Sequence, residues 1–325
     1  MQRYILFLLL VLLYGCVEHT FIFRVHPNGS YNVQYSAHGD KMDLQNHDFS
    51  LPQGDGWSIH STMENVEAES YDFTANRLFK RWEKFPRTFF RGDSIYYESL
   101  IKHPISIKYT NWFFSETYTF YATFEGRNSE VKYPLIAELL RHKEDVFPDG
   151  WLQEGLAYLL TETLSRSPIE WNTRPIIESS LRNWIEEELQ SVSDSILFDE
   201  LDYYKNLGLD IIMQPASPNL YSAMDSIFKS LEDELKITMD LDGDDFYFQL
   251  ILPGSLVSSN ADTLIGDTLF WDFTITDYMN QDYIMEAKST IPYPGRKKAG
   301  KIILLLLGIL FLGKQAQKKI ASKAK

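Results

Sequence analysis

The hydrophobic pattern of this 325-residue chain changes its period twice, and this change constrains the fold more than any other sequence feature. Residues 21–25 and 31–35 alternate between two faces on either side of the Pro-Asn-Gly turn at 26–30. Alternation with a period of two around such a turn predicts a β-hairpin. The same period returns at 246–252 and 269–275. Strands are therefore expected at both ends of the folded body.

Between these strands, from Ser129 onward, apolar residues recur at intervals of three and four, which is the pattern of helices that bury one face. The segments 94–100 and 105–124 are rich in Ile, Tyr, Phe and Thr, which favours strands, as does 57–61; residues 69–82 fit either a strand or a short helix. The helices expected are 133–143, 151–164, 175–192, 197–207 and 218–237.

Strands that enclose a block of helices predict an α+β fold, here a mainly antiparallel sheet with a large helical insertion. A C-terminal transmembrane helix is expected in addition. The expected segments are a signal peptide at 1–15, a β-rich part at 16–128, the helical insertion at 129–239, a second β-rich part at 240–295 and a membrane anchor with a basic tail at 296–325.

The first sixteen residues have the composition of an export signal. A short start that contains Arg3 is followed by an apolar run of about ten residues, too short to cross a bilayer comfortably. Leu13, Tyr14, Gly15 and Cys16 resemble the lipobox of bacterial lipoproteins. This resemblance implies cleavage after Gly15 and lipidation of the Cys16 thiol, the only thiol in the chain. An ordinary signal peptide with a chance cysteine is the alternative.

A second apolar run, 302–313, lies near the C-terminus and has no polar face. Its twelve residues would span about 18 Å as a helix, which is short for a hydrocarbon core of about 30 Å. Lys301 and Lys314 bracket the run and could extend their side chains to the headgroups. A short membrane span is predicted, with a buried core helix as the alternative. With the Cys16 lipid, it would hold the body on the extracytoplasmic side of a cell membrane.

The distribution of charge also separates the C-terminal segment from the body. The segment 296–325 holds nine bases and no acid, whereas the body 17–295 holds 21 bases and 45 acids, a net charge of −24. An acidic body repels nucleic acid, so no nucleic-acid partner is expected, whereas a basic tail favours an anionic membrane surface.

Residues 250–271 resemble a pattern found in bacterial lipoproteins with an LppM-like domain. A strand ends at Pro253-Gly254, Asn260 follows, and a Gly266-Asp267 turn leads into a strand that carries Trp271. The turn at 26–30 and the layout of both ends also fit this family. The resemblance implies an α+β ectodomain and no enzymatic activity, with lipid or glycolipid binding proposed for some members. Ordinary turn chemistry also explains these residues.

Two segments resemble metal-binding motifs but lack residues that those motifs require. The segment around Glu154 resembles the part of gluzincin aminopeptidases that supplies the third zinc ligand, but the stretch where the histidines should lie, 131–135, contains none. The acidic stretch 240–245 lacks the glycine and the acid that an EF-hand loop requires at its sixth and twelfth positions. No metal, cofactor or enzymatic activity is therefore expected, with a hydrolase that uses Glu154 or Asp244 as the remaining alternative.

The sequence thus predicts a non-enzymatic envelope lipoprotein that binds a lipid-like ligand, a glycolipid or a partner protein. A scaffold that docks a membrane complex through its helical insertion is the alternative. The aromatic-rich segments around 112 and 118–121 are more typical of a protein core, but any apolar ligand is expected there. The candidate binding residues are Trp112, Phe114, Tyr118 and Tyr121.

Overall fold

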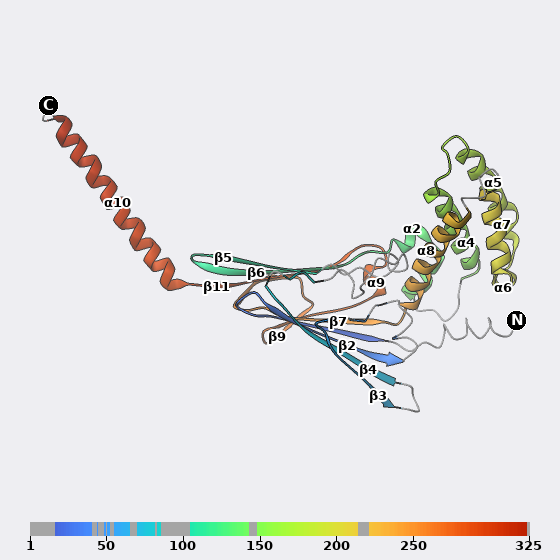
Figure 1. Ribbon diagram of the computed structural model, residues 1–325, viewed down its shortest axis with the longest axis horizontal. Coiled ribbons are helices and arrows are strands. Elements are labelled where there is room, and N and C mark those ends of the chain that lie inside the picture. Colours follow the sequence, from blue (N-terminus) through green and yellow to red (C-terminus); the bar gives the residue numbers. More distant parts are fainter. Residues whose placement is uncertain are drawn as a thin grey trace.

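The computed structural model describes residues 17–40, 44, 49, 51–52, 55–65, 70–81, 83–85, 105–142, 148–213 and 221–323. The signal peptide, Cys16 and the strand expected at 94–100 lie outside these residues. The described chain has an α+β fold, as the sequence predicts, but its strands form two sheets instead of the one sheet expected. Figure 1 shows the sheets in the middle of an elongated molecule, with a group of helices at one end and a single long helix projecting from the other.

The first sheet has seven strands in the order β3-β4-β2-β1-β7-β10-β9, and the second has four in the order β5-β6-β11-β8. The strands of the first sheet are β1 (Glu18–Val25), β2 (Tyr31–Asp40), β3 (Ser58–Asn65), β4 (Ser70–Phe79), β7 (Asp245–Ile251), β9 (Thr263–Ile265) and β10 (Thr268–Thr274). The strands of the second sheet are β5 (Ile105–Trp112), β6 (Ser115–Phe124), β8 (Ser255–Ser259) and β11 (Tyr283–Pro292).

The predicted β1–β2 hairpin is confirmed, with Val25 paired to Tyr31 and Gly29 at a φ of 84° in the turn. Residues 69–82, which the sequence left undecided, contain strand β4. The sheet departs from the expected antiparallel pairing at one place, because β1 and β7 run parallel, with Phe21 opposite Phe248. This pairing joins the beginning of the body to its end, across a connection that contains strands β2 to β6 and the helical part.

The two sheets pack face to face through aromatic side chains. Phe120 of the second sheet lies with its ring centroid 5.8 Å from that of Phe23 and 5.6 Å from that of Phe248, both in the first sheet. Phe124 meets Phe246 in the same way at 5.4 Å. Edge-on and offset ring packing of this kind stabilises a core beyond the area it buries. Many of the aromatic residues of the sequence therefore form the core between the two sheets.

The helical part encloses a second apolar core of its own, built around Leu160, Leu197, Ile212 and Phe228. The expected helix at 197–207 is wrong in detail, since it breaks at Glu200 into α6 and α7, and the one at 175–192 ends as a separate turn, η3. The elements are α2 (Ser129–Lys132), α3 (Pro134–His142), α4 (Trp151–Arg166), α5 (Arg174–Glu187), η3 (Leu189–Ser191), α6 (Asp194–Asp199), α7 (Leu201–Met213) and α8 (Tyr221–Asp240).

After β10 the chain makes a short helix, α9 (Ile275–Tyr278), and then strand β11, which leads into the projecting helix α10 (Pro294–Lys323). The apolar run of α10 is only 302–313, between Lys301 and Lys314. None of the helices in the described part of the chain is both long enough and apolar enough to cross a membrane. The predicted transmembrane helix is therefore not supported, because charges interrupt the apolar run on both sides.

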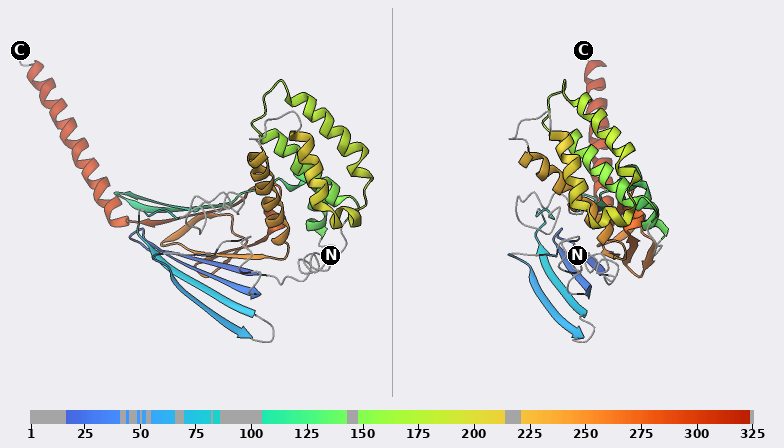
Figure 2. Two further views of the ribbon diagram at one scale, coloured as in Figure 1. Left: turned by 45° about the vertical axis from the view of Figure 1, so that its right-hand side comes forward. Right: turned by 90° about the vertical axis from the view of Figure 1, so that its right-hand side faces the viewer.

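The two ends of the body lie at opposite ends of the sandwich (Figure 2). Val17 lies beside Asp244, in the link from the helical part to β7. Pro292, just before α10, pairs with Ser115 at the other end, where Tyr118 donates a hydrogen bond to the carbonyl of Pro27 in the β1–β2 turn. Strand β1 alone, with eight residues, covers about 26 Å of the distance between these ends.

Candidate functional site

The four aromatic residues singled out from the sequence occupy three different environments. Trp112 is the last residue of β5 and Phe114 lies in the turn between β5 and β6, and they are 65% and 40% exposed. Tyr121 is 39% exposed and lies on β6, whereas Tyr118 is fully buried in the sandwich core. Burial raises the pKa of the Tyr118 hydroxyl, which also lies near the Glu116 carboxylate. Tyr118 is thus placed in the core and not on a binding surface.

Phe113, which was not among the candidates, lies between Trp112 and Phe114 and is 61% exposed. We call these three residues the aromatic tip. The rings of Phe113 and Phe114 pack edge to face, with centroids 5.0 Å apart. Three consecutive large aromatic side chains on a hairpin turn form an apolar protrusion in water, an arrangement that is unusual unless it meets another apolar surface.

The aromatic tip is fixed to the start of α10. The backbone N–H of Tyr293 donates to the carbonyl of Phe114 at 2.9 Å. A Cβ atom added at Gly300 would come within 2.6 Å of Cε1 of Phe114, so the Phe114 ring lies directly against the α10 backbone. The Arg296 guanidinium lies 4.1 Å from the centroid of the Tyr293 ring. The tip and the first turns of α10 therefore form one continuous surface.

The Glu116 carboxylate, on β6 next to this surface, accepts several hydrogen bonds. Partial desolvation alone would raise the pKa of its carboxyl group, but hydrogen bonds from Tyr293, Tyr109 and Tyr118 together with the charge of Arg296 lower the pKa below its ordinary value. The carboxylate is therefore ionised and engaged by groups from β5, β6 and the start of α10. It ties α10 to the second sheet instead of adding a free negative charge beside the tip.

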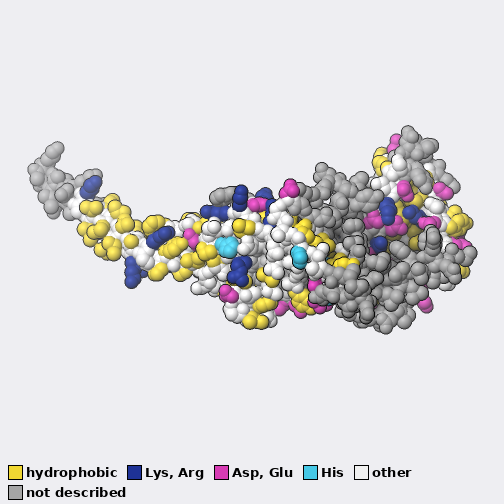
Figure 3. Space-filling view, turned by 60° about the horizontal axis from the view of Figure 1, so that its bottom comes forward, with side chains coloured by type: hydrophobic (Ala, Val, Ile, Leu, Met, Phe, Trp, Pro, Cys, Tyr) yellow, Lys and Arg dark blue, Asp and Glu magenta, His cyan; other side chains and the backbone are white. Residues whose placement is uncertain are grey.

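Beyond Gly300, the apolar side chains of α10 are exposed to solvent. Ten apolar residues between Ile302 and Leu312 each expose between 53% and 69% of their surface. Figure 3 shows these side chains covering the projecting helix, with basic side chains at its base and on the adjoining part of the body. The exposed apolar area is far larger than a lone protein in water normally presents.

At the opposite end of the body, Val17 is buried and its backbone is held on both sides. Its N–H donates to Oδ1 of Asp244 at 3.2 Å, and its carbonyl accepts from the N–H of Asp245 at 3.1 Å. The His19 Nε2 atom lies 3.2 Å from Oδ2 of Asp244, and its Nδ1 atom lies 2.7 Å from the Tyr35 hydroxyl. Asp244 is thus a structural residue of the core.

Burial raises the pKa of Asp244 well above its ordinary value, although the Val17 N–H opposes the rise. The charges of Asp245, Asp240 and Asp242 add to it. Burial also raises the pKa of Asp240 to about 6. Among the described residues, no group of three or more His, Cys, Asp or Glu side chains could hold a metal ion.

The helical part contains an open groove of about 1040 Å³ that the sequence did not indicate. Residues of α3, α4, α5 and the η3–α6 link line it, with apolar walls from Leu135, Ala157, Tyr158, Ile185 and Val192. Pockets of a few hundred to a thousand cubic ångströms with mostly apolar walls are typical of small-molecule sites.

Two polar side chains of α4 lie in this groove. Gln153 is buried and donates from Nε2 to the carbonyl of Val192 at 2.5 Å, while its Oε1 atom is buried without a hydrogen-bond partner. Oε2 of Glu154 accepts from the N–H of Leu135 at 2.8 Å and so caps the start of α3. Burial raises the pKa of Glu154, and the N–H groups of Leu135 and Ile136 lower it. The stretch 131–135 beside Glu154 contains no histidine, so the partner ligands of the zinc motif are missing there.

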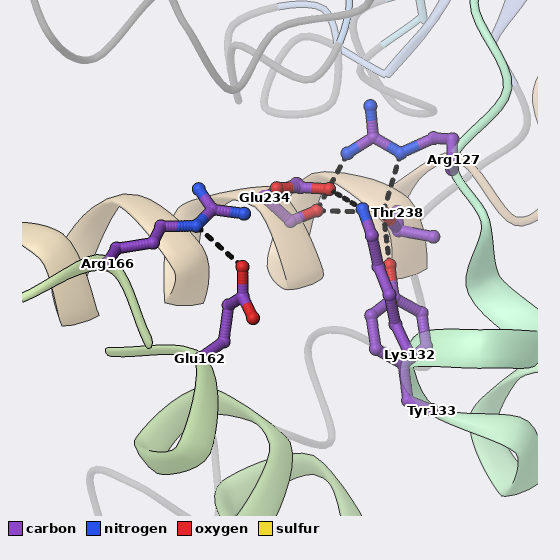
Figure 4. A network of polar contacts seen from close by, with 7 residues as sticks. All are labelled: Arg127, Lys132, Tyr133, Glu162, Arg166, Glu234 and Thr238. Carbon is purple, nitrogen blue, oxygen red and sulfur yellow. Dashed lines mark hydrogen bonds and ion pairs between the residues drawn. The ribbon is translucent and has the colours of Figure 1, made fainter. Parts of the chain in front are cut away.

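A polar network connects the helical part to the sandwich (Figure 4). Arg127, which is buried, donates from Nε to Oγ1 of Thr238 at 2.7 Å and from Nη2 to the carbonyl of Glu234 at 2.9 Å. Lys132 forms an ion pair with the Glu234 carboxylate, and the Tyr133 hydroxyl donates to Thr238. Helix α8 is therefore held to the segment that leaves β6.

Comparisons with known proteins give one weak structural similarity. No protein-family model matches the chain, and no curated protein matches it. Its structure is similar to the NMR structure of the folded domain of the Mycobacterium tuberculosis LppM protein, with a TM-score of 0.32 and 8% sequence identity over 87% of this chain and 94% of that chain. A similarity of this size does not establish a common fold, and the chain is not assigned to a family.

Proposed function

We propose that this protein is a non-enzymatic envelope lipoprotein, held at a cell membrane by a lipid on Cys16 and by the apolar segment of α10, with its body outside the cytoplasm. The observation that carries the proposal is the run of ten exposed apolar side chains from Ile302 to Leu312, which projects from the body. Transfer of such a run from water to an apolar layer is strongly favourable.

The lipobox-like sequence before Val17 supports the second attachment. A single acyl chain binds a membrane only marginally, whereas two or more chains, or one chain with another membrane element, hold a protein stably. Because the backbone of Val17 is fixed in the core, a lipid on Cys16 would be one residue from rigid structure. The lipid would therefore hold this end of the body directly at the bilayer surface, without a flexible tether.

The positions of the two attachments define how the body would lie. Val17 and Pro292 are at opposite ends of the sandwich. One bilayer can hold both attachments when the strands run along its surface, because an upright sandwich would lift Cys16 away from the membrane by about the length of strand β1. We therefore propose that the body lies along the membrane, with the helical part beside the Cys16 end.

The non-enzymatic part of the proposal is supported by the two carboxylates that a hydrolase could use most readily. Glu154 accepts a backbone N–H at the start of α3, and Asp244 accepts the N–H of Val17 in the core. Asp244 is buried in the core, where a substrate does not reach it, and one oxygen of Glu154 is committed to the backbone of α3, whereas a general base must be free to meet the proton it removes. A Glu154→Gln variant is expected to leave the biological activity of the protein unchanged.

A second function, binding of a lipid-like ligand, is favoured by the groove along α4. The buried Oε1 atom of Gln153 is an acceptor without a partner at the edge of this groove. A buried acceptor costs free energy until a donor reaches it. The groove would thus suit an uncharged amphiphile with a hydroxyl or amide donor, such as the sugar of a glycolipid, and an apolar portion against Tyr158 and Ile185.

The scaffold alternative is supported by a separate surface. Trp171, just before α5, is 86% exposed, and Ile176 on α5 is 66% exposed. Large apolar side chains on a polar surface are typical anchors for partner proteins. Crosslinking in cells from position 171 should recover a specific envelope protein if this alternative holds, and should recover none if the ligand groove is the functional element.

The attachment at Cys16 is tested by labelling cells that express the full chain with an isotopic fatty acid and measuring the mass of the N-terminal peptide. We expect label in the wild type, none in Cys16→Ser, and a peptide that begins at a doubly or triply acylated Cys16. An unmodified Cys16, or an N-terminus at another residue, would refute lipidation.

A further inference from the structure

We propose that the aromatic tip and the basic start of α10 form a docking surface for the headgroup layer of an anionic bilayer. The inference rests on the proposed function, because α10 is the element that brings this surface to the membrane. It goes further in naming a site on the folded body, outside the apolar run of α10, that enters the membrane and sets the orientation of the body.

The composition of the aromatic tip fits the boundary between headgroups and acyl chains. Trp112, Phe113 and Phe114 expose 65%, 61% and 40% of their surfaces at the end of a hairpin. Aromatic side chains gather at this boundary because their rings leave water while the polar edge of tryptophan keeps a hydrogen-bonding partner. The hairpin backbone is paired up to Trp112 and Ser115, so the tip is presented on a rigid element.

Charge identifies the kind of bilayer. Arg296, Lys297, Lys298 and Lys301 are all exposed in the first two turns of α10, which pack against the tip. The sequence from Ala287 to Lys325 contains no acidic residue, although the body as a whole has a net charge of −24. Clusters of bases beside a membrane element bind anionic lipids. The ionised Glu116 carboxylate offsets part of the Arg296 charge, which leaves Lys297, Lys298 and Lys301 as the exposed bases beside the tip.

The same chain provides a contrasting exposed aromatic residue. Trp171 is more exposed than Trp112, at 86%, but it belongs to the helical segment 129–239, which holds 21 acids and nine bases. An anionic surface repels a region with a net charge of −12. Exposure alone therefore does not predict membrane contact; the combination of aromatic side chains, adjacent bases and the apolar helix is found at the aromatic tip.

The test places a polarity-sensitive fluorophore at single thiols in the full chain. Because Cys16 is the only cysteine, Cys16→Ser provides a background in which each introduced thiol is labelled alone. The positions are Phe113→Cys at the tip, Leu307→Cys in α10 and Trp171→Cys as the matched exposed control. The proteins are mixed with phosphatidylcholine vesicles, with or without phosphatidylglycerol, that carry nitroxide quenchers at the headgroup or in the acyl chain.

We expect quenching at Phe113→Cys by the headgroup nitroxide in phosphatidylglycerol vesicles, at least about threefold above that at Trp171→Cys, and weaker quenching in phosphatidylcholine alone. Quenching at 307 with none at 113 would overturn the docking surface and leave the proposed membrane attachment intact. Absence of quenching at both positions would overturn the docking surface and the attachment together. Equal quenching at 113 in both kinds of vesicle would overturn the assignment to an anionic bilayer.

Discussion

The backbone N–H of Val17 donates a hydrogen bond to the buried carboxylate of Asp244, which follows it by 227 residues in the sequence. This contact closes the body, because it joins the first residue before β1 to the residue that precedes β7, the parallel partner of β1. The two strands place Phe21 beside Phe248 in the centre of the core, with ring centroids 5.4 Å apart. The beginning and the end of the body therefore fold as one unit.

Removal of the Asp244 carboxylate should destabilise this junction. In Asp244→Ala the buried N–H of Val17 loses its acceptor, which typically costs about 1–3 kcal/mol. Asp244→Asn keeps an acceptor oxygen in the same place and should retain most of the stability. Urea unfolding of the full chain in detergent measures the difference. Equal stability of Asp244→Ala and the wild type would show that the contact contributes nothing.

The pH dependence of stability should reveal Asp240. Burial raises the pKa of this group in the folded protein to about 6 from 3.8. A raised folded-state pKa means that its stabilising contribution is complete below about pH 4 and is lost as the pH rises through 6. The Asp240→Asn variant should therefore gain about 2–3 kcal/mol relative to the wild type between pH 4 and 7. Asp267→Asn, at an exposed turn, is the control for loss of one charge.

The result for Asp240 is read from unfolding midpoints measured across this pH range. If the difference between Asp240→Asn and the wild type stays constant from pH 4 to pH 7, the carboxyl group does not titrate in this window and the explanation by burial is wrong.

Two arginines drawn in Figure 4, Arg127 and Arg166, should contribute very differently to stability. Arg127 is buried and donates to Thr238 and to the carbonyl of Glu234, so Arg127→Met should cost about 2–4 kcal/mol. Arg166 makes a partly exposed pair with Glu162, four residues earlier, and Arg166→Met should cost less than about 0.5 kcal/mol. Hydrogen exchange should show faster opening of α8 in Arg127→Met alone. Comparable effects of both substitutions would contradict the role given to Arg127.

Two glycines with positive φ form another matched pair. A Cβ atom at Gly254, which has a φ of 89°, would lie 2.4 Å from the backbone oxygen of Thr290. A Cβ atom at Gly266, with a φ of 64°, meets nothing within 4 Å. Gly266→Ala should cost about 1 kcal/mol for the conformation alone, and Gly254→Ala clearly more because β8 must move away from β11. Thermal unfolding measures both losses of stability. A smaller loss for Gly254→Ala than for Gly266→Ala would show that the backbone near Thr290 moves away easily.

Local patterns were enough to predict the elements that depend on local contacts. The β1–β2 hairpin follows from alternation around one turn, and most helices follow from apolar spacing within their own segments. The parallel pairing of β1 with β7 was missed, because it depends on contacts such as the one between Phe21 and Phe248, which no short window contains. The break at Glu200 was missed for a related reason, since the apolar spacing continues across it.

The candidate site was predicted only in part. Aromatic composition drew attention to 112–121 but could not separate the buried Tyr118 from the exposed Trp112, because strand ends and turns decide which side chains leave the core. Phe113 could have been found from the aromatic triplet in the predicted hairpin turn. Gln153 gave no signal, since its buried acceptor results from the packing of α4 against Val192 in another segment.

The central claim is that two separate attachments hold the body at the membrane, and alkaline carbonate extraction of cell membranes tests it most directly. Four full-length proteins are compared: the wild type, Cys16→Ser, a variant with Leu305, Leu307 and Leu310 replaced by Gln, and the combination. The account predicts that the wild type and each single-site variant stay with the membrane, at least in part, and that the combination is released. Complete release after either change alone, or retention of the combined variant, would contradict it.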